Sequence, residues 1–273
     1  MIAIRPQAGL ANRMRSLDSA IQLANILDED ILIYWVRTPD FNCSFFDLFK
    51  LPSKVKIKES DSKIRDNGRA QRIFLTAFKL FGLNFPRGYD YYYYHNDILS
   101  LKKLSDFSVS FPREKSVFLQ TDTRFYSNGK DYEQFVPSNN ILEKVKLFLD
   151  QNINSKYIGI HIRRTDNLKS IANSPTQLFI ESMENELFLN PAICFYLATD
   201  SPEEERDLKK KFGEKIVIRK KELERSNPIG IQDALIDLMI LSKAQKIYGS
   251  FYSSFSETAA AIGKVELKIL TAT

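Results

Sequence analysis

The stretch Tyr157–Asn167 reads YIGIHIRRTDN and joins a short apolar strand pattern to a charged end. Alternation along a strand places its three isoleucines on one face and His161 with Arg163 on the other, while Arg164 points away. Open parallel sheets bind ligands at the carboxyl ends of their strands, where a guanidinium can clamp a phosphate. The alternative interpretation is a strand end whose arginines are in water, and spacing alone does not separate the two.

Strand and helix patterns alternate around this stretch, from Asn139 to the end of the chain. Helices are predicted over 139–150, 176–187, 203–212, 232–244 and 256–262, and strands over 157–162, 193–198, 215–219, 246–250 and 265–270. Two helix starts, Ser174–Gln177 and Ser201–Glu204, fit capping boxes with a proline at the first helical position. Strands joined by single helices need right-handed crossovers, so we expect a parallel sheet covered on both faces, as in a Rossmann-like domain.

The N-terminal part begins in the same way and then loses its regular pattern. A strand over 2–5, a helix ending at Leu27 and a strand over 31–36 are followed by aromatic and basic segments without clear periodicity up to Lys115, and then by a strand over 117–121. A proline and a few small polar residues near Pro137 indicate a boundary. We therefore predict an α/β chain with domains over 1–136 and 137–273, of which the second is the clearer parallel sheet.

Composition and the absence of common motifs exclude several functional classes of protein. The chain has 273 residues, a net charge of +5, two cysteines and two histidines, His95 and His161, which are too few for a disulfide framework or a zinc site of ordinary spacing. Neither a GxxxxGK[ST] nor a GxGxxG motif is present. The basic runs Lys209–Lys211 and Arg219–Lys221 are expected to be solvated, so no nucleic-acid partner is predicted. Without an apolar leader pattern or a membrane span, we expect a cytoplasmic protein with at most peripheral membrane contact.

Three further features could build a nucleotide site beside the arginine pair. The strand over 246–250 runs into a serine-rich turn that opens a helix, so free N–H groups and hydroxyls there could bind an anion, or one serine could simply cap the helix. Asp237 shares a helix face with Asp233 and could accept the paired donors of a base such as guanine if that face is turned from water. Asp200 lies just past the end of a strand.

Taken in order, these segments resemble a known family. The segments GIHIRRTDN, YLATDSPEE and ALIDLMILSKAQKIYGSFYSSFSETAA resemble the C-terminal domain of the fucosyltransferase superfamily, which includes α1,6-, α1,2- and protein O-fucosyltransferases. The segment RPQAGLANRMRSLDSAIQLA resembles the glycine-asparagine loop and first helix of its N-terminal domain. The resemblance covers the first ~35 residues and most of the region after Tyr157, and leaves the middle unmatched.

The resemblance implies a GT-B architecture, with two Rossmann-like domains facing a cleft, GDP-fucose as the donor, and neither a catalytic metal nor another cofactor. Arg163 is then expected to contact the β-phosphate of the departing GDP, with His161 and Asp237 near guanine. The other expected donor-binding residues are Arg164, Asp200, Ser253, Ser254, Phe255, Ser256, Asn12 and Arg13. The implied reaction is an inverting transfer of fucose to a hydroxyl of a carbohydrate acceptor.

The general base and the acceptor site are less clearly indicated. Family members of the α1,6 type have an acidic residue several positions after the arginine pair, but here no carboxylate lies between Asp166 and Glu181. Asp166 is the candidate base, or it orients an arginine through a salt bridge. Tyr92 and Tyr94 could present aromatic faces to a sugar, although alternation along a strand also fits tyrosines that are half core and half surface. A glycosyltransferase with another nucleotide-sugar donor and a non-catalytic nucleotide-binding protein remain as alternatives.

Overall fold

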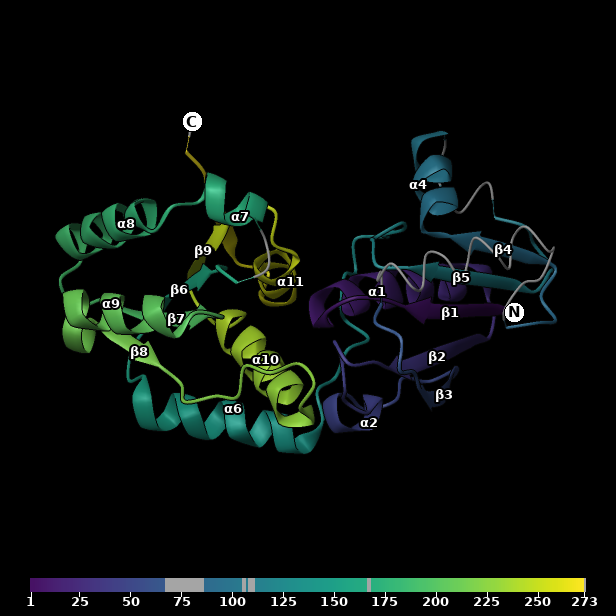
Figure 1. Ribbon diagram of the computed structural model, residues 1–273, viewed down its shortest axis with the longest axis horizontal. Helices are drawn as coiled ribbons and strands as arrows, with labels where there is room; N and C mark the ends of the chain where they lie inside the picture. The colour runs from purple at the N-terminus through teal and green to yellow at the C-terminus, as the bar shows by residue number, and fades with distance from the viewer. Residues whose placement is uncertain (67–85, 105–106, 108–110, 166–167, 273) are drawn as a thin grey trace. The chain divides into compact units, whose positions relative to one another are not determined.

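The structure is a computed structural model that describes residues 1–66, 86–104, 107, 111–165 and 168–272. The chain forms two compact units, both labelled in Figure 1. Unit 1 comprises Met1–Ser138 and Glu224–Gln232, and unit 2 comprises Asn139–Leu223 and Asp233–Thr273. The division after Ser138 lies next to Pro137, whereas Glu224–Gln232, which the sequence placed in the second domain, belongs to unit 1.

Unit 2 is built on a parallel sheet of five strands in the order β10-β9-β6-β7-β8. The strands are β6 (Tyr157–Ile162), β7 (Cys194–Thr199), β8 (Ile216–Ile218), β9 (Lys246–Ser250) and β10 (Glu266–Leu270). The helices are α6 (Asn139–Asn152), α7 (Leu168–Asn173), α8 (Thr176–Leu189), α9 (Pro202–Phe212), α10 (Pro228–Leu241) and α11 (Ser254–Gly263), with a 3₁₀ turn, η1, at Gly213–Lys215. The first residues of α10, up to Gln232, are counted in unit 1. The chain moves outward from β6 to β8 and then returns to the other side of β6, so the order of strands reverses between β6 and β9.

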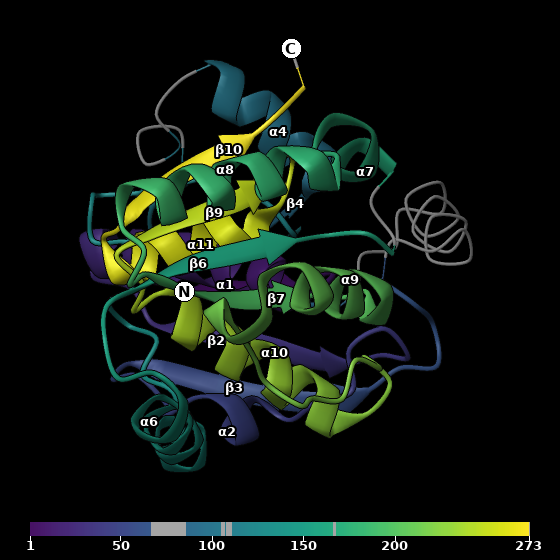
Figure 2. The ribbon, with the colours of Figure 1, turned by 90° about the vertical axis from the view of Figure 1, so that its left-hand side faces the viewer.

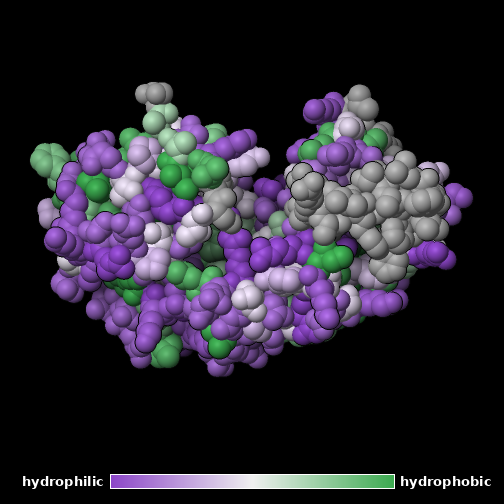
Figure 3. Space-filling view, viewed as in Figure 1, coloured by the Kyte–Doolittle hydropathy of each residue, from purple (hydrophilic) through white to green (hydrophobic). Residues whose placement is uncertain are grey.

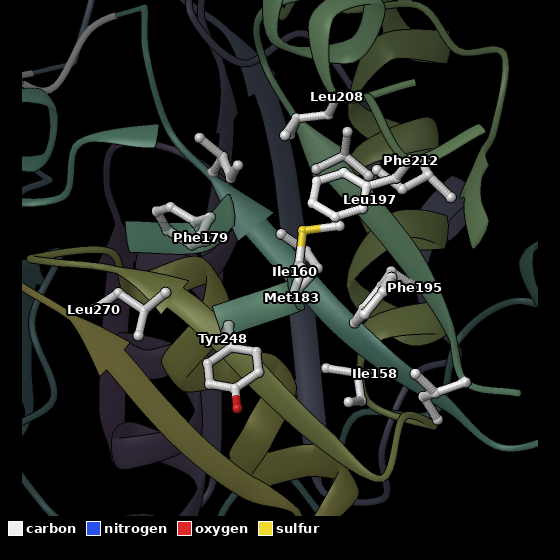
Figure 4. Packing of buried hydrophobic residues seen from close by; sticks show 13 residues of the cluster. Ile158, Ile160, Phe179, Met183, Phe195, Leu197, Leu208, Phe212, Tyr248 and Leu270 are labelled. Atoms are coloured by element: carbon white, nitrogen blue, oxygen red, sulfur yellow. The ribbon is translucent and has the colours of Figure 1, made fainter. Parts of the chain in front are cut away.

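The two faces of β6 are covered by different helices, as alternation predicted. Ile158, Ile160 and Ile162 belong to a core cluster with side chains of α8 and α9 (Figure 4), and Figure 2 shows α8 and α9 in front of the sheet. The opposite face carries Gly159, where an added Cβ would come within 2.9 Å of Leu241 Cδ2 on α10. A glycine at this position lets α10 pack directly on the strand.

The two predicted capping boxes have different outcomes. The Ser201 hydroxyl accepts a hydrogen bond from Glu204 N at 3.3 Å, which confirms the cap of α9. The prediction for Ser174 is wrong, because its hydroxyl donates to Leu270 O and accepts from Phe251 N, and α8 begins after Pro175 without a side-chain cap. The hydroxyl instead ties together segments that are distant in sequence.

Unit 1 contains a second parallel sheet, in the order β3-β2-β1-β5-β4. The elements are β1 (Ile2–Pro6), α1 (Leu10–Leu27), β2 (Ile31–Arg37), α2 (Phe45–Leu48), β3 (Val55–Asp61), β4 (Tyr91–Tyr94), α4 (His95–Leu104) and β5 (Val117–Thr121). The region that the sequence left irregular therefore supplies β3 and β4. Both are edge strands with one covered side and polar or aromatic residues, so they lack the continuous apolar run of a central parallel strand.

The fold class is therefore α/β, with two Rossmann-like parallel sheets. Within the described ranges, no helix is both long and apolar enough to cross a bilayer. The face visible in Figure 3 is mostly hydrophilic, and its apolar residues form small separate groups.

Candidate functional site

The carboxyl ends of β6 and β9 meet where the strand order of unit 2 reverses, which is where ligands bind in open parallel sheets. Arg163 directly follows β6, and its backbone N–H donates to the Ser250 hydroxyl at 3.1 Å. Ser250 is the last residue of β9, and the same hydroxyl lies 3.3 Å from the backbone oxygen of His161. One buried hydroxyl thus ties the two strand ends together and fixes the backbone of Arg163, whose side chain is half-buried.

The start of α11 offers donors at the same edge of the sheet. Ser253 is the N-cap residue, yet its hydroxyl makes no capping hydrogen bond, and this buried oxygen has no partner among the described residues. Gly249 allows the close packing of the helix start on β9, because an added Cβ would lie 2.6 Å from Ser256 Oγ. The first N–H groups of a helix and its dipole favour an anion, so this turn can bind a phosphate.

His161 and Phe255 meet between this sheet edge and α11. Their rings stack with centroids 4.9 Å apart and an interplanar angle of 26°. Burial, assisted by the charge of Arg163, lowers the pKa of His161 to about 3. The imidazole is therefore neutral at physiological pH, and its buried Nδ1 has no hydrogen-bond partner in the described part of the chain. A buried polar atom without a partner is rare and marks a position that a ligand can satisfy.

Asp237 is buried on α10 and held by three side chains of its own unit. Its Oδ1 accepts from the Tyr196 hydroxyl at 2.7 Å and from Arg219 Nε and Nη2 at 3.0 and 2.9 Å, and its Oδ2 accepts from Lys221 Nζ at 3.0 Å. Burial alone would raise the pKa of Asp237, but the charges of Lys221 and Arg219 outweigh it and keep this pKa below 3.8. The carboxylate is ionised, and Oδ2, which accepts one hydrogen bond in the protein, can accept a further one from a ligand.

The expectation that the run Arg219–Lys221 is solvated is wrong for two of its three residues. The side chains of Arg219 and Lys221 are only 12% and 4% exposed. Arg219 also pairs with Asp233 at 2.7 Å, and Lys221 lies 3.2 Å from Glu205. Alternation after β8 sends these two cations to the same side and leaves Lys220 exposed. In the sequence, burial of Arg219 and Lys221 could have been recognised from their i, i+2 spacing after a strand. The i, i+4 spacing of Asp233 and Asp237 on α10 was the matching signal for their partners.

Arg164 and Asp200 organise the turn that follows β6. The Arg164 guanidinium bonds Glu204 Oε1 at 2.6 Å and Thr176 Oγ1 at 3.0 Å. Asp200 accepts from the backbone N–H of Arg164 at 2.7 Å and from the Thr165 hydroxyl at 2.7 Å. Both residues thus hold the backbone beside Arg163, and their predicted contact with a donor is untested. Asp166, the predicted base, lies outside the described residues.

The residues predicted from the N-terminal loop lie in unit 1 and differ in exposure. Arg13 is completely buried, and its guanidinium bonds the backbone oxygens of Ala8 and Val36 as well as Asp66, at 3.0, 2.8 and 2.8 Å. This arrangement gives Arg13 a structural role and does not support a direct contact with a donor. Asn12 is half-buried on α1, and its predicted contact stays a prediction.

The tyrosines of β4 alternate as expected. Tyr91 and Tyr93 stack on one side with centroids 6.4 Å apart, while Tyr92 packs on Phe118 and donates its hydroxyl to Pro86 O at 2.8 Å. Tyr92 and Tyr94 are half-buried, so the tyrosine run is partly core. Their predicted contact with an acceptor sugar is untested, and the Tyr92 hydroxyl already has a partner.

Similarity to solved structures extends over nearly the whole chain. NodZ α-1,6-fucosyltransferase from Bradyrhizobium, in a crystal soaked with GDP-fucose, superposes with a TM-score of 0.65 at 16% identity, covering 96% of this chain and 92% of that chain. POFUT1 superposes with a TM-score of 0.60 at 13% identity in its apo form, covering 98% and 97%. The chain has the fold of these fucosyltransferases. POFUT1 in complex with GDP-fucose gives a TM-score of 0.56, also at 13% identity and with coverage of 98% and 97%.

Comparisons of the sequence with family models and with curated proteins give no match. The shared fold is nonetheless of the GT-B type that the sequence resemblance implied, and both Rossmann-like sheets are present. It places the arginine pair and the serine turn at the sheet edge where this fold class binds ligands.

Proposed function

We propose that this protein transfers fucose from GDP-fucose to a hydroxyl of a carbohydrate, with inversion and without a metal ion. The observation that carries the proposal is the fold shared over 96% of the chain with an α-1,6-fucosyltransferase structure soaked with GDP-fucose. The site in unit 2 supports it independently, because Arg163 directly follows β6 and α11 begins shortly after β9, and these two strands are neighbours at the point where the strand order reverses.

Arg163 and the start of α11 are proposed to bind the diphosphate. As the bond between fucose and the β-phosphate lengthens, negative charge grows on the phosphate oxygens. Fixed donors stabilise this charge more in the transition state than in the ground state, which is the condition for a faster reaction. Ser253 has a buried hydroxyl with no partner, so it can donate to a phosphate oxygen without giving up a bond in the protein. Ser254 and Ser256 lie in the first turn of the same helix.

The guanine of GDP is proposed to bind beside His161, Phe255 and Asp237. Neutral Nδ1 of His161 can form one hydrogen bond, and the Phe255 ring covers the imidazole. Asp237 Oδ2 has one protein donor and can accept another from the N–H groups on the edge of guanine. Arg219 and Lys221 then act as positioning residues, because they hold the Asp237 carboxylate ionised in a buried site.

The other predicted residues have supporting parts in this proposal. Arg164 and Asp200 fix the turn behind Arg163. Asn12 remains a candidate for contact with the donor and Asp166 for the general base, while Tyr92 and Tyr94 remain candidates for contact with the acceptor.

The proposal is tested by donor selectivity and product stereochemistry. Calorimetric titration should show GDP binding at least about tenfold tighter than UDP or ADP, since one unsatisfied buried polar group costs about 1–3 kcal/mol. GDP-fucose should be consumed with a panel of neutral oligosaccharides in the presence of EDTA, and NMR should show an α-linked product from the β-linked donor. Preferential binding of UDP, or GDP binding without turnover of any GDP-sugar, would support the two alternative functions instead.

A further inference from the structure

Tyr252 is an exposed aromatic residue of unit 2 to which the proposed function gives no part. It lies between Ser250, the last residue of β9, and Ser253, the N-cap residue of α11. Its φ of 55° lies in the left-handed region, which bulky side chains rarely adopt. The residue is nevertheless 66% exposed. A backbone outlier of this kind directly beside a binding turn indicates a functional position.

The ring of Tyr252 is held by two neighbours. Lys169 Nζ, from α7, lies 5.0 Å from the ring centroid, a distance at which a cation and an aromatic ring attract each other. The ring of Phe251 lies with its centroid 6.1 Å away, at an interplanar angle of 35°. The Tyr252 ring therefore has a defined position while much of its surface remains open to a ligand.

The helix that carries Lys169 also packs against the backbone of Arg163. Ser170 is buried, and its hydroxyl donates to Arg163 O at 3.4 Å. Arg163 N in turn donates to the Ser250 hydroxyl on β9, and both α7 and α11 contact that strand (Figure 1). Tyr252 therefore lies at the rim of the proposed phosphate site, between the helix start that would bind the phosphates and the helix that flanks Arg163.

The order of strands places Tyr252 on the side of Arg163 opposite to the proposed guanine site. Asp237 is bonded by Tyr196 on β7 and by Arg219, which directly follows β8. Tyr252 follows β9, which lies on the other side of β6 in the order β10-β9-β6-β7-β8. A GDP-sugar with its base beside Asp237 and its phosphates at the end of β6 directs its sugar toward β9, because the sugar is attached to the β-phosphate.

We propose that Tyr252 is a specificity-determining residue that contacts the 6-deoxy sugar of the donor, with Lys169 as its positioning residue. This inference rests on the proposed fucosyl transfer and adds the means by which the donor sugar is selected. Fucose has a methyl group where the corresponding hexose has a C6 hydroxyl, so it offers more apolar surface to an aromatic face. A hydroxyl against the same ring would lose its hydrogen bonds to water. Leu168, the first residue of α7, is 81% exposed and adds an apolar side chain at this end of the helix.

Phe188 provides a matched comparison within unit 2. It is even more exposed than Tyr252, at 85%, but it lies near the end of α8. A helix that connects two parallel strands runs antiparallel to them, so its end lies at the amino edge of the sheet, away from the proposed site. Exposure of an aromatic ring alone therefore does not distinguish the two residues, whereas their places in the fold do.

The test compares GDP-L-fucose with GDP-L-galactose, which differs from it only by a hydroxyl on C6. GDP release is followed with the best acceptor of an oligosaccharide panel, and the selectivity is the ratio of the two kcat/KM values. The wild type should prefer GDP-fucose by about 10–100-fold, as expected for an apolar pocket that meets an added hydroxyl. Tyr252→Asn should lower this ratio at least about tenfold, with GDP affinity within about twofold of wild type; asparagine is chosen because it tolerates a positive φ.

Three control variants separate the ring from other contributions. Tyr252→Phe keeps the aromatic face and should keep the ratio, and Phe188→Asn should behave as the wild type. Lys169→Gln should lower the ratio by a smaller factor than Tyr252→Asn, while Lys169→Arg, which keeps a cation over the ring, should retain it.

Several results would overturn the assignment and leave the transfer function standing. These are a wild type that transfers fucose but uses GDP-L-galactose equally well, a Tyr252→Asn variant with the wild-type ratio, and a Tyr252→Phe variant that loses the ratio as fully as Tyr252→Asn does. Loss of GDP affinity in folded Tyr252→Asn would make Tyr252 a part of the phosphate turn instead. If the wild type turns over neither donor, the transfer function fails, and calorimetry with the two GDP-sugars decides the contact: tighter binding of GDP-fucose that Tyr252→Asn removes supports it, and equal binding overturns it.

Discussion

The buried carboxylate of Asp237 allows a quantitative test of the site in unit 2. Asp237→Ala removes the acceptor of four hydrogen bonds, from the Tyr196 hydroxyl, two nitrogens of Arg219 and Lys221 Nζ. Breaking a buried ion pair from one side typically costs about 3–5 kcal/mol, because a charge is left without its partner. Arg219 keeps Asp233 and Lys221 keeps Glu205, so we expect the lower end of that range, about 3 kcal/mol.

The pH dependence of this effect has a definite sign. The pKa of Asp237 in the folded state lies below its ordinary value of 3.8, since the neighbouring cations outweigh burial. A carboxylate with a depressed pKa contributes stability that is fully present above pH 3.8 and is lost as the pH falls through the folded-state pKa. The difference between wild type and Asp237→Ala should therefore be constant from about pH 5 to 8 and shrink at lower pH.

Urea unfolding followed by far-UV circular dichroism is the suitable assay, because the single tryptophan, Trp35, lies in unit 1. Asp237→Asn, which keeps an acceptor oxygen, should cost less than Asp237→Ala. The control Asp207→Ala, at an exposed position of α9, should stay within about 0.5 kcal/mol of wild type. If Asp237→Ala matches that control, the buried network does not stabilise unit 2 and the reasoning is refuted.

Three further perturbations test the same unit. Ser253→Ala should leave the free energy of unfolding unchanged within about 0.5 kcal/mol, because the Ser253 hydroxyl has no partner among the described residues. It should weaken GDP binding up to about tenfold in calorimetry, as loss of one hydrogen bond implies. Equal GDP affinity would remove Ser253 from the site. Gly249→Ala should cost about 1–3 kcal/mol in urea unfolding, because the new Cβ would lie 2.6 Å from Ser256 Oγ, and an unchanged midpoint would contradict this close packing. Burial lowers the pKa of His161 to about 3. Below pH 6.5 the unfolded chain therefore binds a proton that folded His161 does not, so the folded state loses stability between pH 6.5 and pH 3, and His161→Gln should remove an acid sensitivity on the order of 5 kcal/mol. An identical pH profile of stability would show that His161 is not the group responsible.

Much of unit 2 could be predicted from the sequence because its signals are local. The predicted strand at 246–250 matches β9, and alternation in YIGIHI separated the isoleucine core from His161 correctly. Edge strands β3 and β4 were missed, since they need no continuous apolar run. Ser174 looked like a cap but bonds Leu270 O, a partner 96 residues away that no local pattern can indicate.

The candidate site was predictable in its positions and less so in its partners. The sequence brought His161, Phe255 and the serine turn to one sheet edge, and the structure places His161 against Phe255. The sequence did not indicate that Arg219 and Lys221 are buried beside Asp237, because charged runs are ordinarily solvated.

The central claim is that Arg163 stabilises charge on a departing GDP. The most direct measurement is kcat for GDP release from GDP-fucose by Arg163→Ala, compared with wild type and with the control Arg206→Ala at an exposed position of α9. Loss of one such donor should raise the barrier by about 2.7–4 kcal/mol, or lower kcat by about 10²–10³-fold, in a variant whose circular dichroism shows that it is folded. Arg206→Ala should match wild type. A folded Arg163→Ala protein that releases GDP at the rate of wild type would contradict the account.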